Sequence, residues 1–178
     1  MVPNFVRRLG GPLGLLALAI LGPARAEGQD LDAVKSGFVY NFTKFMEWPA
    51  GALPSGGGTM QLCVAGQALD GRLNQLQGRV SQGREIRVRG VGASSDLSTC
   101  HVLFIGASEE RRMGGLLGAV SGYPVLTISD ISEFADYGGM IGLELRNDRV
   151  GFAINLSNAR AAGLKPSAQL VKLGRVAQ

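Results

Sequence analysis

Two short apolar stretches in the middle of the chain constrain its fold more than any other feature. They read "CHVLFIG" and "PVLTISD" and lie at residues 100–106 and 124–130. A continuous apolar run of this length is typical of a strand that is buried on both faces of a sheet. Between them, "SEERRMGGLLGAV" indicates a helix that begins near Ser108, although its glycines weaken it. Buried strands that alternate with helices predict an α/β fold.

Aromatic residues gather near the start of the chain, in "VKSGFVYNFTKFMEWP" at residues 34–49. Asp30 or Asp32 can cap a helix here, and Pro49 ends it near Trp48. An apolar stripe recurs along this helix at steps of four and three and consists of Val34, Phe38, Phe42 and Phe45. The spacing indicates that the aromatic cluster is mostly core.

The other segments predict further strands and helices around the central strands. "MQLCVAG" at residues 60–66 indicates a strand, and residues 68–76 indicate a short helix. The alternating stretch "REIRVRGV" at residues 84–91 is typical of a strand with one solvated face, near a sheet edge. The Asn147-Asp148 pair indicates a hairpin turn, and two helices follow, the second capped by Ser167. The sequence therefore predicts a three-layer sandwich with a mixed, partly parallel sheet and a C-terminal β-hairpin plus helices.

The first residues predict an export signal. Arg7 and Arg8 precede the uncharged apolar run Leu13–Leu21, and Ala24-Arg25-Ala26 offers a cleavage site. The run is much shorter than the ~20 residues that span a bilayer, which argues against a membrane anchor. We therefore expect residues 1–26 to be a signal peptide, cleaved after Ala26, and residues 27–178 to form a single domain in the periplasm.

The net charge of the chain does not indicate nucleic-acid binding. The chain has 18 basic and 14 acidic residues, but Arg7, Arg8 and Arg25 belong to the predicted signal peptide. Without them the protein is close to neutral, so the high isoelectric point gives no support for a polyanionic partner.

The two cysteines, Cys63 and Cys100, both lie in the predicted mature protein. In an oxidising compartment an even pair indicates one disulfide bond, while two buried free thiols are the alternative. One cysteine lies in the strand at residues 60–66 and the other opens "CHVLFIG", so a bond would join neighbouring strands.

The sequence contains no recognisable catalytic motif. The single histidine, His101, directly follows Cys100 and begins a buried strand, which favours a structural role over a Ser-His-Asp arrangement. No cysteines or histidines have zinc-site spacing, and neither a phosphate-binding loop nor a dinucleotide fingerprint occurs. We expect a protein that is not an enzyme and that has no metal and no cofactor.

A ligand crevice is one interpretation of the loops that follow the buried strands. In open α/β sheets, ligands bind beyond the carboxyl ends of the strands. Those ends carry Gly66-Gln67, Gly106-Ala107-Ser108 and Ser129-Asp130. Gln67, Ser108 and Asp130 are therefore candidate ligand-binding residues, and ordinary short connections are the commoner alternative.

Six blocks of the sequence, in order, resemble the signature blocks of YfiR-like (HmsC-like) periplasmic proteins. They read "YNFTKFMEWP", "CVAG", "CHVLFI", "VLTISD", "GGMIGLEL" and "INLSNARAAGLKPSAQLVKL". The resemblance covers nearly all of residues 34–176. It also marks Asn41, Lys44 and Trp48, in the first block, as candidate ligand-binding residues.

The resemblance implies a regulator that represses a membrane diguanylate cyclase of the YfiN type by binding its periplasmic sensor domain. An outer-membrane lipoprotein of the YfiB type is implied as a second partner, and nucleotides or tryptophan as small ligands. A homodimer is left open. The alternative function is a periplasmic sensor that binds a small molecule, a nucleotide or an aromatic ligand, and controls another signalling partner.

The resemblance also implies redox sensitivity and a partner surface. Cys63 and Cys100 match the family's central disulfide pair, whereas a second pair found in some relatives is absent here. We expect exposed apolar surface near Phe152, Ile154 and Leu170 to bind the partner, although Ala153 stands where relatives usually have Glu.

Overall fold

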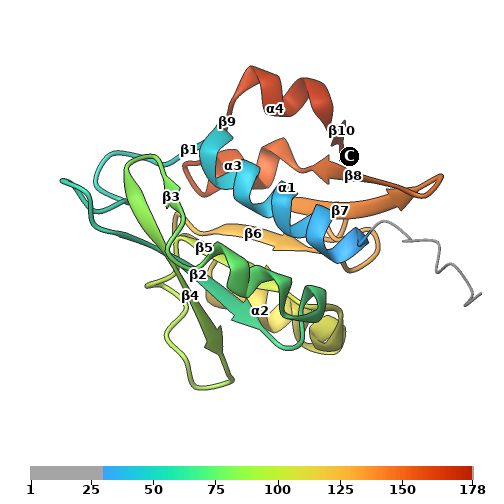
Figure 1. The fold of residues 1–178 in the computed structure, drawn as a ribbon, viewed down its shortest axis with the longest axis horizontal. Helices are drawn as coiled ribbons and strands as arrows, with labels where there is room; N and C mark the ends of the chain where they lie inside the picture. Colours follow the sequence, from blue (N-terminus) through green and yellow to red (C-terminus); the bar gives the residue numbers. More distant parts are fainter. Residues whose placement is uncertain (1–29, 178) are drawn as a thin grey trace, which may run out of the picture.

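An eight-stranded mixed sheet forms the middle layer of the protein (Figure 1). The computed structural model describes residues 30–177, so the expected signal peptide and its cleavage after Ala26 lie outside the described residues. The strand order across the sheet is β10-β8-β7-β6-β5-β2-β4-β3. These strands are β2 (Thr59–Ala65), β3 (Val80–Ser81), β4 (Arg84–Val91), β5 (Val102–Ile105), β6 (Leu126–Ser129), β7 (Ile141–Arg146), β8 (Arg149–Ile154) and β10 (Arg175–Val176).

The five strands in the middle of the sheet, from β4 to β7, are parallel. The short strand β3 adds to β4 and the hairpin partner β8 adds to β7, both in antiparallel orientation. β10 closes the far edge, parallel to β8. This arrangement confirms the predicted mixed, partly parallel sheet with a C-terminal hairpin.

Helices cover both faces of the sheet. They are α1 (Leu31–Phe45), η1 (Leu69–Leu76), η2 (Ala107–Arg112), α2 (Met113–Ala119), α3 (Leu156–Ala161) and α4 (Ala168–Leu173). Residues of α1, η1, α3 and α4 belong to one apolar cluster, and residues of α2 belong to another. The fold is therefore the predicted three-layer α/β sandwich.

The strand β5 lies in the middle of the sheet, and both of its faces are buried. Val102 and Phe104 pack into the first cluster, whereas Leu103 and Ile105 pack into the second. All four side chains are fully buried. Successive side chains of a strand point to opposite faces, so a strand between two helical layers must be apolar at every position.

The first helix, α1, begins as predicted but ends earlier. Asp30 caps it by accepting a hydrogen bond from the Ala33 backbone N–H at 3.0 Å. The helix stops at Phe45 and not near Trp48, because the next two residues form the short strand β1 (Met46–Glu47). β1 pairs with β9 (Lys165–Pro166), a partner that is remote in the sequence and that local pattern could not reveal.

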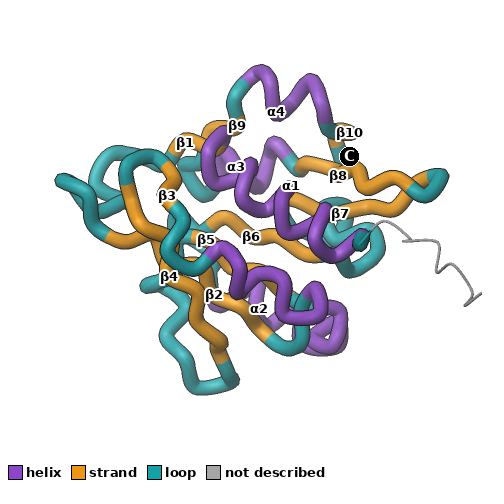
Figure 2. Tube along the Cα trace, in the orientation of Figure 1, coloured by secondary structure: helices purple, strands orange, loops and turns teal. Residues whose placement is uncertain are grey.

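The hairpin and the closing helices follow their local signals. Asn147 and Asp148 both have positive φ, of 49° and 58°, as a tight hairpin turn requires. The hairpin projects from the body of the protein (Figure 2). Ser167 caps α4 by accepting from the Leu170 N–H at 3.2 Å. In contrast, the helix expected at residues 68–76 is a 3₁₀ segment, η1, with non-helical backbone at Asp70 and Gly71.

Candidate functional site

The crevice expected beyond β2 and β5 is closed by contacts between two loops. The Gln67 backbone N–H donates to Ser108 Oγ at 2.9 Å. A Cβ added to Gly106 would lie 2.0 Å from the Gln67 carbonyl oxygen, and one added to Gly66 would lie 2.4 Å from Ser108 Oγ. The two glycines therefore let the loops pack against each other. Gln67 and Ser108 lie side by side as predicted, but they are hydrogen-bonded to each other.

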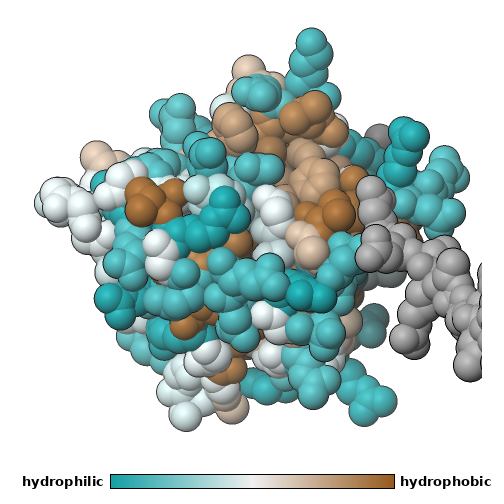
Figure 3. Space-filling view, viewed as in Figure 1, coloured by the Kyte–Doolittle hydropathy of each residue, from teal (hydrophilic) through white to brown (hydrophobic). Residues whose placement is uncertain are grey.

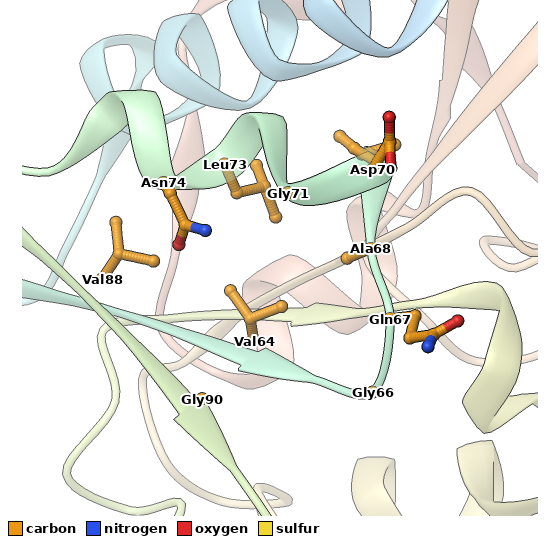
Figure 4. Close-up of a pocket in the computed structure, with 11 residues that line it drawn as sticks. Val64, Gly66, Gln67, Ala68, Asp70, Gly71, Leu73, Asn74, Val88 and Gly90 are labelled. Carbon is orange, nitrogen blue, oxygen red and sulfur yellow. The ribbon is translucent and has the colours of Figure 1, made fainter.

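A cavity of about 640 Å³ lies beside this junction, between β2, β4 and η1 (Figure 4). Val64 and Val88 from the two strands, with Leu73 from η1, supply apolar side chains to it. Asn74 points from η1 toward the space between the two valines (Figure 4). The cavity thus combines an apolar interior with a few polar groups, as small-molecule sites commonly do.

Strained backbone forms one rim of this cavity. Leu69 and Asp70 have φ values of 46° and 43°, and Gly71 follows at 73°. For residues other than glycine this left-handed region costs about 1–3 kcal/mol each, and such residues cluster at ligand-binding and switch sites. The Leu69 side chain is buried, so its apolar contacts offset part of this cost. The rim supports the cavity as the best candidate ligand site among the described residues.

The charge of the cavity lining narrows the class of ligand. Asp70 is the charged residue among the described lining residues, and none of them is Lys or Arg. Arg72, on the same segment, is paired with Asp30 instead. Phosphate groups are bound through cations or helix N-termini, so this lining favours an uncharged or amine-bearing ligand over a nucleotide.

The other candidate ligand residues lie at separate places. Asn41 and Lys44 are exposed on α1, where Lys44 Nζ lies 5.3 Å from the centre of the Tyr40 ring. Trp48 lines a different cavity, of about 340 Å³, and its indole nitrogen has no hydrogen-bond partner within the described residues. Asp130 accepts from Lys35 Nζ at 2.9 Å. The structure therefore does not assemble the six candidates into one site.

The disulfide bond between Cys63 and Cys100 is present, as predicted. It joins the buried strand β2 to the turn before β5, with a Cα–Cα distance of 5.9 Å. Both residues are buried in the cluster on the α2 face of the sheet, where Leu97 and Leu103 also pack. The bridge is thus part of the core.

His101 has the structural role that its position suggested. Its Nδ1 accepts the Gln61 backbone N–H at 2.8 Å, and the backbone N–H of His101 donates to the Gln61 carbonyl at 3.0 Å. The side chain thereby extends the pairing of β2 with β5 by one residue. Burial lowers the pKa of the imidazole, and the charge of Arg84 adds to the effect.

Phe152, Ile154 and Leu170, the residues predicted to bind the partner, are themselves buried, so the prediction is wrong for these three side chains. They are 5%, 0% and 3% exposed. Phe152 packs edge-on against Phe42, with ring centres 4.9 Å apart. The aromatic stripe of α1 covers this face of the hairpin, so the three residues hold the helical layer to the sheet.

Exposed apolar side chains lie close to these buried residues. Leu173 at the end of α4 is 70% exposed, Val176 in β10 is 47% exposed, and Leu145 on the hairpin is 52% exposed. Figure 3 shows hydrophobic surface over α4 and beside α1. We call Leu145, Leu173 and Val176 the C-terminal apolar surface. The family resemblance pointed to this region of the chain. The residues that a partner could contact there are the exposed ones, Leu145, Leu173 and Val176, and not the three that were predicted.

Sequence reasoning missed the ion cluster that fastens β10 to the rest of the sheet. Arg175 Nη2 lies 2.7 Å from both Asp136 Oδ2 and Glu144 Oε1. These hydrogen bonds to Asp136 and then Glu144 raise the pKa of Arg175 further. The three residues come from remote segments, and no local pattern links them.

Within residues 30–177 no group of three or more His, Cys, Asp or Glu side chains could hold a metal ion. None of the helices in that range has both the length and the hydropathy of a membrane span. A family model described as YfiR/HmsC-like matches residues 32–175. That match spans nearly all of the described helices and of the sheet. The chain therefore belongs to the YfiR/HmsC-like family.

Proposed function

We propose that this protein represses a membrane diguanylate cyclase by binding the periplasmic sensor domain of that enzyme. Membership of the YfiR/HmsC-like family supports a periplasmic regulatory role with a protein partner, and it is the observation that carries the proposal. Residues 1–26 would direct export, and the remainder would act as one domain. An outer-membrane lipoprotein that sequesters the repressor, and a homodimer, belong to the same proposal.

The C-terminal apolar surface is the part of the structure that best suits such a partner. Its three residues expose aliphatic side chains next to charged groups of the Arg175 cluster. Aliphatic side chains ringed by polar groups are a common composition of protein interfaces. Gly174 lies between Leu173 and Val176, and a Cβ added to it would lie 2.4 Å from the Phe152 ring, so this part of the surface packs directly on the core.

Redox control is the second part of the proposal. The bridge is the only disulfide bond within the described residues, and both its cysteines are buried. Its reduction would destabilise the domain and lower the amount of folded repressor. Repression would then be relieved without any reaction at a catalytic thiol.

A gene deletion tests this function. Deleting the gene should raise cellular cyclic di-GMP when the cognate cyclase is expressed, and export of the wild-type protein should restore the low level. Leu173→Asp provides the matched variant, because this side chain is exposed and its change should leave the fold intact. An unchanged cyclic di-GMP level after deletion would refute the repressor role.

The cavity under η1 favours a second candidate, a sensor for a small molecule. Its volume and mixed lining suit a small ligand without a phosphate group. A ligand that binds the folded state alone raises thermal stability as its concentration rises. Thermal shift measurements with matched amine and carboxylate forms of one aromatic scaffold test this function, with Val88→Trp as the variant that fills the cavity. A shift that is equal in Val88→Trp and the wild type would argue against the cavity.

A further inference from the structure

Arg89 lies directly against the disulfide bond. β4 runs beside β2 (Figure 1), and the register places Arg89 opposite Cys63. Its Nη2 atom lies 3.5 Å from Cys100 Sγ. The same nitrogen donates to Thr99 Oγ1 at 2.6 Å and to the Asp96 carbonyl at 3.3 Å. Hydrogen bonds from the loop before β5 therefore hold the Arg89 guanidinium next to the sulfur of Cys100.

Among residues 30–177 no carboxylate forms an ion pair with Arg89, so none of them cancels the charge of this guanidinium directly. Asp96 offers Arg89 its carbonyl oxygen, while its carboxylate accepts from the Ser98 hydroxyl and N–H at 2.6 and 2.9 Å. Those two bonds, and to a lesser extent the charge of Arg89, lower the pKa of Asp96. The carboxylate is exposed to solvent, whereas the contact of Arg89 with the sulfur is partly buried. Solvent and salt therefore screen the electrostatic interaction of the Asp96 carboxylate with the sulfur more than they screen the interaction of Arg89 with it.

We propose that Arg89 makes the Cys63–Cys100 bond easier to reduce, by stabilising the thiolate that Cys100 carries once the bond is broken. The inference rests on the redox control proposed above and names the residue that sets it. A cation beside a sulfur favours thiolate over thiol, whereas burial in an apolar core does the opposite. Without Arg89 this buried bridge would resemble an inert structural disulfide.

The reaction is a two-electron reduction by a dithiol. One thiolate of the reductant attacks Cys63 Sγ, the disulfide bond breaks, and the electron pair remains on Cys100 Sγ. The second thiol of the reductant then displaces Cys63, which takes up the proton of that thiol, and the reductant leaves as a cyclic disulfide. Both cysteines are buried, so attack needs the loop to open. Arg89 acts on the equilibrium between bridged and reduced protein, which does not depend on the route.

Redox titration of three variants tests the proposal. Arg89→Gln keeps a donor for the loop but removes the charge, and Arg89→Lys keeps the charge. Arg87→Gln is the matched control, because Arg87 lies on the same strand and pairs with Glu85, away from the bridge. Each protein is equilibrated with mixtures of reduced and oxidised dithiothreitol, and its thiols are trapped and counted by mass spectrometry. Circular dichroism verifies that the reduced forms remain folded.

At alkaline pH we expect the reduction equilibrium constant to fall about tenfold in Arg89→Gln, which corresponds to about one pKa unit for the thiol. The difference between Arg89→Gln and the wild type should vanish in acid, because Cys100 then carries a protonated thiol in both reduced proteins. Arg87→Gln should match the wild type, and Arg89→Lys should lie near it. Equal constants for Arg89→Gln and the wild type at alkaline pH, or an equal change in Arg87→Gln, would overturn the proposal.

A second measurement isolates Cys100. In Cys63→Ala, ultraviolet absorbance follows thiolate formation at Cys100 without needing a reagent to reach it. Adding Arg89→Gln should raise the midpoint by about one pH unit; an unchanged midpoint would count against the inference. If Cys63→Ala does not fold, the dithiothreitol equilibrium decides alone. Neither readout involves a cyclase, so failure of the deletion experiment and failure of this one are separate results.

Discussion

Removal of the disulfide bond is the perturbation whose size the structure fixes best. The bridge closes a loop with a sequence separation of 37 residues. On the chain-entropy relation, such a loop stabilises the folded state by about 4 kcal/mol relative to the open chain. Domains of this size have about 5–15 kcal/mol in total. Loss of the bridge should therefore raise the unfolded fraction nearly a thousandfold. The folded form remains the major species at equilibrium, and degradation of the larger unfolded fraction in the cell lowers the amount of repressor.

The assay is denaturant unfolding of oxidised and reduced wild type beside the double variant Cys63→Ala, Cys100→Ala. Alanine is chosen because both sites are buried, and a serine hydroxyl there would add its own desolvation cost. Reduction should lower the free energy of unfolding by about 4 kcal/mol in the wild type and by nothing in the double variant. The same two proteins are then compared for cyclic di-GMP output.

Two results would contradict this prediction. A reduced wild type that is as stable as the oxidised form would show that the bridge does not stabilise the domain. A double variant with wild-type stability that no longer represses the cyclase would show that the cysteines act locally at the partner surface, and not through the amount of folded protein.

Three further predictions concern the loops, the histidine and the partner surface. Gly106→Ala should destabilise by about 1–3 kcal/mol in denaturant unfolding, because the new Cβ meets a backbone oxygen; Gly118→Ala, in open space on α2, should not, and equal effects would contradict the loop contact. Because the pKa of His101 is lowered on folding, the unfolded state takes up its proton first as pH falls below the usual value of 6.5. Stability should therefore be present above that pH and decline below it, a decline that His101→Gln should lessen; a flat pH profile of unfolding would refute this role. Leu173→Asp should derepress the cyclase without lowering the melting temperature, and retained repression would exclude this part of the surface.

Much of the fold could be predicted because its signals are local. Asp30 and Ser167 cap their helices, and the Asn147-Asp148 pair forms the hairpin turn. The apolar run of β5 is buried on both faces, as its pattern indicated. Each of these features depends on residues within a few positions of one another, so a single sequence carries the information.

The candidate site could not be predicted in the same way. Gln67 and Ser108 were chosen because they follow neighbouring strands, and they do meet, but they bond to each other. Gln67 also lines the cavity, but the cavity itself lies between β2 and β4, under a segment whose left-handed backbone no sequence pattern predicts. Phe152 was predicted to be exposed because it lies in a strand of alternating apolar residues. It is buried because α1, more than a hundred residues earlier in the chain, covers it.

The α/β class, the order of the longer helices and strands, the family and the pairing of the two cysteines could all be predicted from the sequence. The tertiary structure alone decided which residues are accessible and which charges lie against the bridge. Arg89 touches Cys100, and Arg175 joins Asp136 to Glu144, because the order of strands in the sheet brings these side chains together. Strand order and register arise from the packing of all layers at once, so local patterns do not contain the contacts that follow from them.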